Sequence, residues 1–65
     1  MESIREKVLR LAGVKQQLNP SWRWGQTVFN TCYELYPSLA DSLRSTKYDP
    51  FYDDSKVESF LGQLN

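Results

Sequence analysis

The chain of 65 residues contains no histidine and a single cysteine, Cys32. Without histidine it lacks the usual general base, the commonest metal ligand and the side chain that titrates near neutral pH. A lone cysteine excludes an internal disulfide and any paired-cysteine zinc or redox site. We expect Cys32 in the middle of an apolar helix face, where burial raises the pKa of its thiol and no histidine activates it. The sequence therefore predicts a protein that is not an enzyme and that binds no metal or cofactor.

Long hydrophobic runs and a net charge are absent as well. No stretch approaches the roughly 18 apolar residues of a membrane span, and the first residues do not form the continuous apolar core of a signal peptide. Eight basic residues balance eight acidic ones, so no overall charge draws the chain to nucleic acid or to a membrane. We expect a cytoplasmic protein without membrane partners, and one free thiol fits a reducing compartment.

The residues that are present suit a small folded domain. Apolar residues make up 40% of the chain and charged residues 25%, which is typical of a globular rather than a disordered protein. At this length we expect a single domain over residues 1–65, near the smallest size at which one core suffices. The apolar residues recur at helical spacing and show no strand alternation, so the predicted fold class is all-α.

Proline and capping signals divide the chain into helices. Asn19 and Pro20 end one helix and begin the next, with the proline at the first helical position. Pro37 ends the second helix, and Ser55 with Glu58 has the spacing of a capping box before the last one. The prediction is a small bundle of three to four helices, at about 3–18, 20–36, 38–44 and 56–64, with an irregular loop at 45–55.

Helical periodicity predicts which side of each helix is buried. The apolar side of the first helix consists of Ile4, Val8, Leu11 and Leu18, and that of the last helix of Val57, Phe60, Leu61 and Leu64. Lys15 falls on the apolar side of its helix, so its ammonium must either extend to solvent or meet a carboxylate. In the second helix Thr27 falls on the polar side. Gly25 lies on the apolar arc, where a missing side chain allows another backbone to come close.

The acidic residues of the segment after the third helix have a structural interpretation. Asp49, Asp53 and Asp54 form a cluster whose spacing fits no EF-hand loop. We expect Asp49 to make an Asx-type turn before Pro50, and the other two to stabilise the start of the last helix.

Aromatic residues are the most informative feature. Nine of them are more than so small a core encloses, and tyrosine and tryptophan dominate the hot spots of protein interfaces. We expect the second helix and the loop 48–54 to form a contact surface for another protein, with Arg23 paired to Asp53 or Asp54. The predicted partner-binding residues are Trp22, Arg23, Phe29, Tyr33, Tyr36, Tyr48, Phe51, Tyr52 and Asp53.

Charge is distributed unevenly along the chain. Residues 1–23 hold five basic and two acidic side chains, whereas residues 24–65 hold three basic and six acidic ones. The two parts can attract each other within one molecule or between two copies.

Two alternatives to the protein-interaction hypothesis remain open. One is a nucleic-acid-binding accessory protein that uses the basic first helix and Arg23. The other is a homo-oligomeric structural subunit, such as a homodimer, because small chains often need such support.

From Arg23 onward, about two thirds of the chain carries a recognisable pattern. It comprises Arg23-Trp24-Gly25-Gln26, Asn30, Tyr33-Glu34, Pro37, Leu39-Ala40, Ser45-Thr46, Asp49-Pro50-Phe51-Tyr52-Asp53-Asp54-Ser55 and Phe60-Leu61. In these residues the chain resembles a family of small uncharacterised proteins encoded by phages, prophages and bacteria, in which glycine often stands at the position of Ser45. The resemblance implies no activity, but it implies a phage context, in which small soluble proteins commonly bind a host or phage protein. The leading prediction is therefore a small non-enzymatic protein-interaction module, a phage-encoded modulator in the host cytoplasm.

Overall fold

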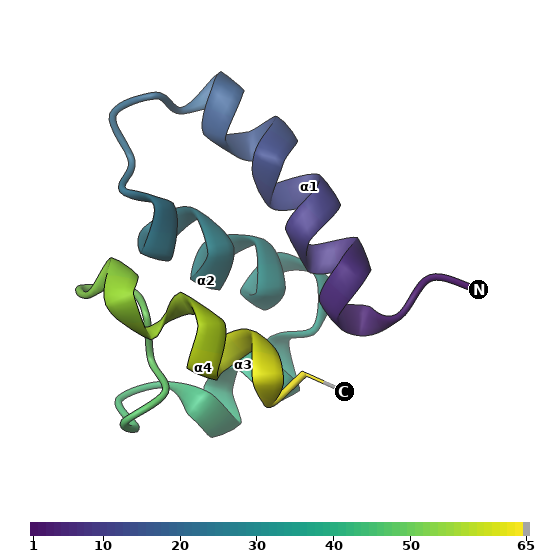
Figure 1. Cartoon of the computed structure of the whole chain (residues 1–65), viewed down its shortest axis with the longest axis vertical. Helices are drawn as coiled ribbons and strands as arrows, with labels where there is room; N and C mark the ends of the chain where they lie inside the picture. The colour runs from purple at the N-terminus through teal and green to yellow at the C-terminus, as the bar shows by residue number, and fades with distance from the viewer. Residues whose placement is uncertain (65) are drawn as a thin grey trace.

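The chain folds into four α-helices and one 3₁₀ turn, as a computed structural model that describes residues 1–64 shows (Figure 1). The elements are α1 (Ile4–Leu18), α2 (Trp24–Leu35), α3 (Pro37–Leu43), η1 (Asp54–Lys56) and α4 (Val57–Gly62). In Figure 1, α2 lies between α1 on one side and α3 and α4 on the other. The predicted all-α fold is confirmed, and the first helix packs against α2 rather than projecting from it.

A capping box starts α1 at the predicted place. The side chain of Ser3 accepts a hydrogen bond from the backbone N–H of Glu6, and the Glu6 carboxylate accepts one from the N–H of Ser3. These reciprocal bonds satisfy two of the donors that a helix start leaves without partners. They also hold the pKa of Glu6 below its ordinary value.

The buried face of α1 is rotated about the helix axis relative to the predicted buried face. Val8 and Ala12 are fully buried against the core, whereas Leu18 is 71% exposed and was expected inside. Of the two alternatives for Lys15 the structure shows the carboxylate, with its Nζ 2.6 Å from Oε2 of Glu34 in α2. Contacts with α2 thus select the buried side of α1.

The start of α2 differs from the prediction. The helix begins at Trp24, and the expected start at Pro20 is wrong. The backbone N–H of Trp22 instead donates to the carbonyl of Asn19 in a turn, at 3.0 Å. The side-chain amide of Gln16 donates a hydrogen bond to the carbonyl of Trp22 at 2.8 Å. In a helix that began at Pro20, this carbonyl would accept a backbone hydrogen bond within the helix instead.

Thr27 was expected on the polar side of α2, and this assignment is wrong because α1 covers that side. The residue is fully buried, and its hydroxyl donates to Oε1 of Gln16 at 2.8 Å. Thr31, one turn further on, is 1% exposed and donates to the carbonyl of Thr27. Two threonines thereby widen the buried surface of α2 without leaving a hydroxyl unpaired.

The last helix and the turn after it supply the predicted core residues, but the helix starts differently. The side chains of Val57, Phe60, Leu61 and Leu64 are all buried, as expected. The expected capping box of Ser55 and Glu58 is absent from residues 1–64, because Asp53 caps the preceding turn η1. Its carboxylate accepts bonds from the Ser55 hydroxyl at 2.6 Å and from the Ser55 N–H at 3.0 Å, which direct that hydroxyl away from α4.

The loop before η1 docks on the start of α2 at a glycine. A Cβ atom on Gly25 would lie 2.8 Å from Oδ1 of Asp54, and closer still to the carbonyl oxygen of the buried Pro50. The backbone N–H of Gly25 also donates to Oδ1 of Asp54 at 2.9 Å. The predicted close approach at Gly25 is confirmed, and it brings the loop residues against α2.

Candidate functional site

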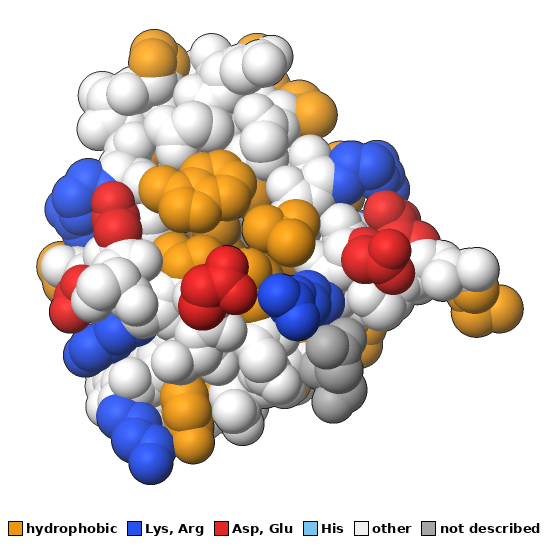
Figure 2. All heavy atoms as spheres, in the orientation of Figure 1, with side chains coloured by type: hydrophobic (Ala, Val, Ile, Leu, Met, Phe, Trp, Pro, Cys, Tyr) orange, Lys and Arg blue, Asp and Glu red, His pale blue; other side chains and the backbone are white. Residues whose placement is uncertain are grey.

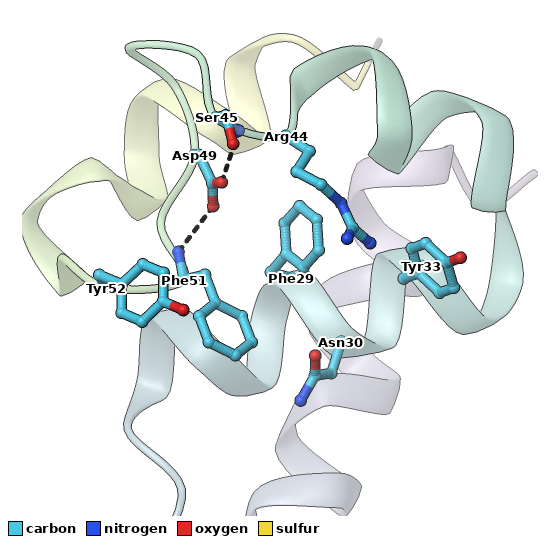
Figure 3. A pocket seen from close by; sticks show the side chains of 8 residues that line it. All are labelled: Phe29, Asn30, Tyr33, Arg44, Ser45, Asp49, Phe51 and Tyr52. Atoms are coloured by element: carbon cyan, nitrogen blue, oxygen red, sulfur yellow. Dashed lines mark hydrogen bonds between the residues drawn. The ribbon is translucent and has the colours of Figure 1, made fainter.

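A pocket of about 520 Å³ opens between α2 and the segment that follows α3 (Figure 3). It is lined by Phe29, Asn30 and Tyr33 of α2 and by Arg44, Ser45, Asp49, Phe51 and Tyr52. Its volume lies within the range of about 300–1,000 Å³ that is usual for ligand pockets. Four of the predicted partner-binding residues meet here: Phe29, Tyr33, Phe51 and Tyr52.

Phe29 forms the floor of the pocket. Its side chain is only 4% exposed, and its ring centre lies 5.9 Å from that of Phe60 in the core and 6.0 Å from that of Phe51. The Phe51 and Phe29 rings are perpendicular, an arrangement that the aromatic quadrupole favours. The floor is thus fixed to the hydrophobic core.

Two tyrosines form the open walls. Tyr33 is 41% exposed and its ring lies 6.4 Å from that of Phe29, centre to centre. Tyr52 is 84% exposed and stands edge-on to Phe51, with the ring centres 4.8 Å apart. Both rings therefore present much of their surface to solvent beside a rigid aromatic floor.

Arg44 adds a cation to these rings. Its guanidinium carbon lies 5.0 Å from the ring centre of Tyr33 and 5.5 Å from that of Phe29, within cation–π range. Its Nε lies 3.5 Å from Oδ1 of Asp41. Figure 3 shows the guanidinium between the two rings at one end of the pocket.

Asp49 organises the loop that forms the opposite side. Its Oδ1 accepts a hydrogen bond from the N–H of Phe51 at 2.9 Å, the predicted Asx-type turn, and its Oδ2 accepts one from the N–H of Ser45 at 2.7 Å. Ser45 has φ 61°, in the left-handed region that non-glycine residues rarely adopt. The Asp49 carboxylate thus ties together the two ends of the turn after α3.

Arg23 and Asp54 clamp the loop to α2 from outside the pocket. A terminal nitrogen of Arg23 donates to the carbonyl of Phe51, and Nε of Arg23 lies 3.8 Å from Oδ1 of Asp54. Of the two predicted partners of Arg23, the structure therefore selects Asp54. Asp53 instead caps η1, where hydrogen bonds from Ser55 hold the pKa of its carboxyl below the ordinary value. Arg23 and Asp53 support the loop and do not line the pocket.

The other predicted residues lie apart from the pocket. Tyr36, at the end of α2, has the ammonium of Lys7 5.9 Å from its ring centre. Tyr48 is partly buried beside Lys47, and Trp22 belongs to the turn between α1 and α2. The expected continuous aromatic surface is thus divided, and one part of it is concave.

Sequence reasoning missed Asn30 and Arg44 as site residues. Asn30 is one helical turn before Tyr33, so the helical spacing could have placed both on one side of α2. Arg44 follows α3 and meets rings of another helix, a contact that no local pattern signals.

Four of the five basic residues of the N-terminal part lie beside carboxylates, and the fifth, Lys7, lies over the ring of Tyr36. The ion pairs are Arg5–Glu58 at 3.5 Å, Arg10–Glu2 at 2.8 Å, Lys15–Glu34 at 2.6 Å and Arg23–Asp54 at 3.8 Å. Three of them join residues 1–23 to the acidic remainder, so the expected attraction operates within one molecule. In Figure 2, acidic and basic side chains alternate around a hydrophobic area between α1 and α4.

The thiol of Cys32 is unreactive. Its side chain is fully buried in α2, and this burial raises the pKa of the thiol to about 11, as the sequence predicts. The thiol therefore stays protonated near neutral pH. Within residues 1–64, no group of three or more Cys, Asp or Glu side chains gathers as a metal-ligand set. The same part of the chain contains no helix with the length and apolar character of a membrane span.

Comparisons with other proteins identify no function, so a functional assignment depends on the geometry of the pocket. The chain matches no family model, and neither the curated proteins nor the solved structures give a match.

Proposed function

We propose that the chain is a small non-enzymatic protein-interaction module, and that the aromatic pocket is its contact surface. One observation carries the proposal: Tyr52 is 84% exposed and Tyr33 41% exposed beside a rigid floor made by Phe29. Large exposed aromatic side chains around a concavity are typical of interface hot spots, where they bury an apolar anchor of the partner. The fixed floor lowers the ordering cost of binding, because few side chains need to be immobilised.

The resemblance to phage-encoded proteins supports a more specific context. Its most characteristic stretch, residues 49–55, contains the pocket residues Phe51 and Tyr52 together with the anchor Asp54. We propose a modulator that binds a host or phage protein in the cytoplasm of the host cell. The buried, protonated thiol of Cys32 is compatible with that compartment.

The proposal is tested by selecting binders from a library of random linear peptides displayed on a carrier. Tyr52→Ala removes an exposed pocket wall, and Leu18→Ala is its matched control, since it removes an exposed apolar side chain from α1. We expect peptides that bind the wild type and Leu18→Ala but not Tyr52→Ala. The proposal is wrong if the wild type retains no peptide above background, or if the retained peptides bind Tyr52→Ala equally well.

A homo-oligomer is the second candidate, and the charged residues at and next to the pocket favour it. The exposed Tyr52 is followed by the carboxylate of Asp53, while the pocket contains the cation Arg44, so the surface carries groups that complement each other between two copies. Light scattering at several protein concentrations tests this candidate. A dimer that Tyr52→Ala dissociates would assign the pocket to a second copy.

Nucleic-acid binding by the first helix has less support. Arg5, Arg10 and Lys15 of that helix each lie beside a carboxylate, so phosphates would have to displace existing ion pairs.

A further inference from the structure

We propose that the pocket recognises a linear segment of its partner in which an aspartate or glutamate stands beside a large apolar side chain. In this proposal Arg44 reads the carboxylate, and the aromatic rings take the apolar side chain. The inference rests on the proposed function and adds the chemistry of the segment that the pocket selects.

Arg44 has donors available for a carboxylate. A guanidinium carries five N–H donors in one plane, in a fork that matches the two oxygens of a carboxylate. The Nε side of Arg44 faces Asp41 at 3.5 Å, and the rings of Tyr33 and Phe29 fix the position of the group. Its two terminal nitrogens form no hydrogen bond with any of residues 1–64, and the side chain is 52% exposed. The fork is therefore held in position while its terminal edge remains open.

The neighbouring charges limit the guest to one negative charge. Arg44 is the only cation that lines the pocket within residues 1–64, and it is already beside Asp41. Asp49 also lines the pocket, with both carboxylate oxygens turned to backbone N–H groups. A phosphate-rich chain would meet two carboxylates and one guanidinium, whereas a single carboxylate matches the guanidinium directly.

Asn30 provides contacts for a peptide backbone. Its side-chain amide forms no hydrogen bond within the described part of the chain, and it offers both a donor and an acceptor. Asn30 lines the pocket from α2, and Figure 3 shows Arg44 reaching toward the rings from the end of α3. An extended segment between them would place its apolar side chain over Phe29, Phe51 and Tyr52 while its carboxylate reaches Arg44.

The test uses the peptides retained by the wild type and their matched glutamine versions. We expect selected peptides to be enriched in aspartate or glutamate next to an aromatic or large aliphatic residue. Exchange of the acidic residue for its amide should weaken binding to the wild type about tenfold, the usual effect of losing a charge-assisted hydrogen bond. Arg44→Gln should bind both versions of a peptide equally, at the weaker level.

Two further variants separate recognition from a loss of folding. Arg10→Gln is the matched control, because Arg10 is similarly exposed (58%) and also paired with a carboxylate, but lies on α1. It should discriminate between the acid and amide peptides as the wild type does. Arg44→Lys keeps the charge without the planar fork, and should show a reduced preference for the acid.

The outcomes distinguish this inference from the proposed function. If peptides bind through Tyr52 but carry no acidic preference, or if Arg44→Gln retains that preference, the inference is wrong and the proposed function stands. If the preference is for a free C-terminal carboxylate or a phosphorylated side chain, the inference is also wrong. If the wild type retains no peptide at all, the proposed function itself fails.

Discussion

The carboxylate of Asp54 accepts a hydrogen bond from the backbone N–H of Gly25 at 2.9 Å, across 29 positions of the sequence. Arg23 lies beside the same carboxylate and donates to the carbonyl of Phe51. These contacts join the start of α2 to the loop that supplies Phe51 and Tyr52 to the pocket. The shape of the pocket therefore depends on an anchor that is not part of its lining.

Replacing Asp54 with alanine should destabilise the protein by about 1–3 kcal/mol, because the buried N–H of Gly25 would lose its partner. Urea denaturation measures the loss. Peptide binding should weaken as well, since the loop that carries Phe51 is released. An unchanged urea midpoint would contradict the role of Asp54 as the anchor.

Gly25→Ala should destabilise the protein by about 2 kcal/mol, because the added methyl group would collide with Asp54 and with the carbonyl of Pro50. Gly13→Ala is the control, since nothing lies within 4 Å of the added Cβ in the middle of α1. That variant should gain about 0.5–1 kcal/mol from helix propensity. Thermal melting of both variants gives the comparison, and a loss of equal size at the two glycines would refute the close approach at Gly25.

Ser45→Gly should stabilise the protein by about 0.5–1 kcal/mol. Its φ of 61° costs a non-glycine residue about 1–2 kcal/mol. Glycine avoids this cost but loses more backbone entropy on folding, so the net gain in stability is smaller. Ser59→Gly, at an exposed position of α4, should instead lose about 0.5–1 kcal/mol. The free energies of unfolding in urea check both signs. A destabilised Ser45→Gly would mean that the turn does not need a left-handed residue.

Raising the pH from about 9 to about 11 should lower the stability of the protein through Cys32. Burial raises the pKa of its thiol to about 11 in the folded state, so the unfolded chain loses this proton at lower pH than the folded one. The contribution is complete below pH 9 and falls by at most about 1.4 kcal/mol per pH unit above it. Because tyrosine and lysine also titrate there, the measurement is the difference between wild type and Cys32→Ala. A difference that stays constant over this pH range would contradict the raised pKa.

Asp53 should contribute to the loss of stability in acid. Hydrogen bonds from the Ser55 side chain and backbone lower the pKa of its carboxyl, so its stabilisation is present above the unfolded pKa and is lost as the pH falls through the folded one. Asp53→Ala should therefore be less stable than wild type near neutral pH and approach it in acid. Its peptide binding near neutral pH should remain, because Asp54 still anchors the loop. Denaturation at a series of pH values tests the convergence.

Local patterns predicted the elements that depend on neighbours along the chain. The bounds of α1, expected at about 3–18, and the apolar spacing of the last helix are examples, because a helix end and a helical face are properties of a few consecutive residues. The predicted start of α2 was wrong because the side chain of Gln16, from another helix, donates a hydrogen bond to the carbonyl of Trp22. The same side chain accepts a hydrogen bond from the buried Thr27.

The candidate site was predictable to the extent that it consists of aromatic residues. The four rings of the pocket were expected at the contact surface, since the nine aromatic residues of the chain are more than a small core encloses. Arg44 and Asn30 were not expected, because they reach the pocket through the packing of α3 and the loop on α2. That packing depends on long-range contacts such as Gly25 with Asp54, which no single segment encodes.

The most direct test of the pocket as a contact surface is a ¹H–¹⁵N spectrum of the wild type titrated with a selected peptide. The account predicts shifts concentrated in the side-chain amide of Asn30, the Nε–H of Arg44 and the backbone amides of Ser45 and Tyr52. Shifts confined to α1, with the signals of these four residues unchanged, would contradict it.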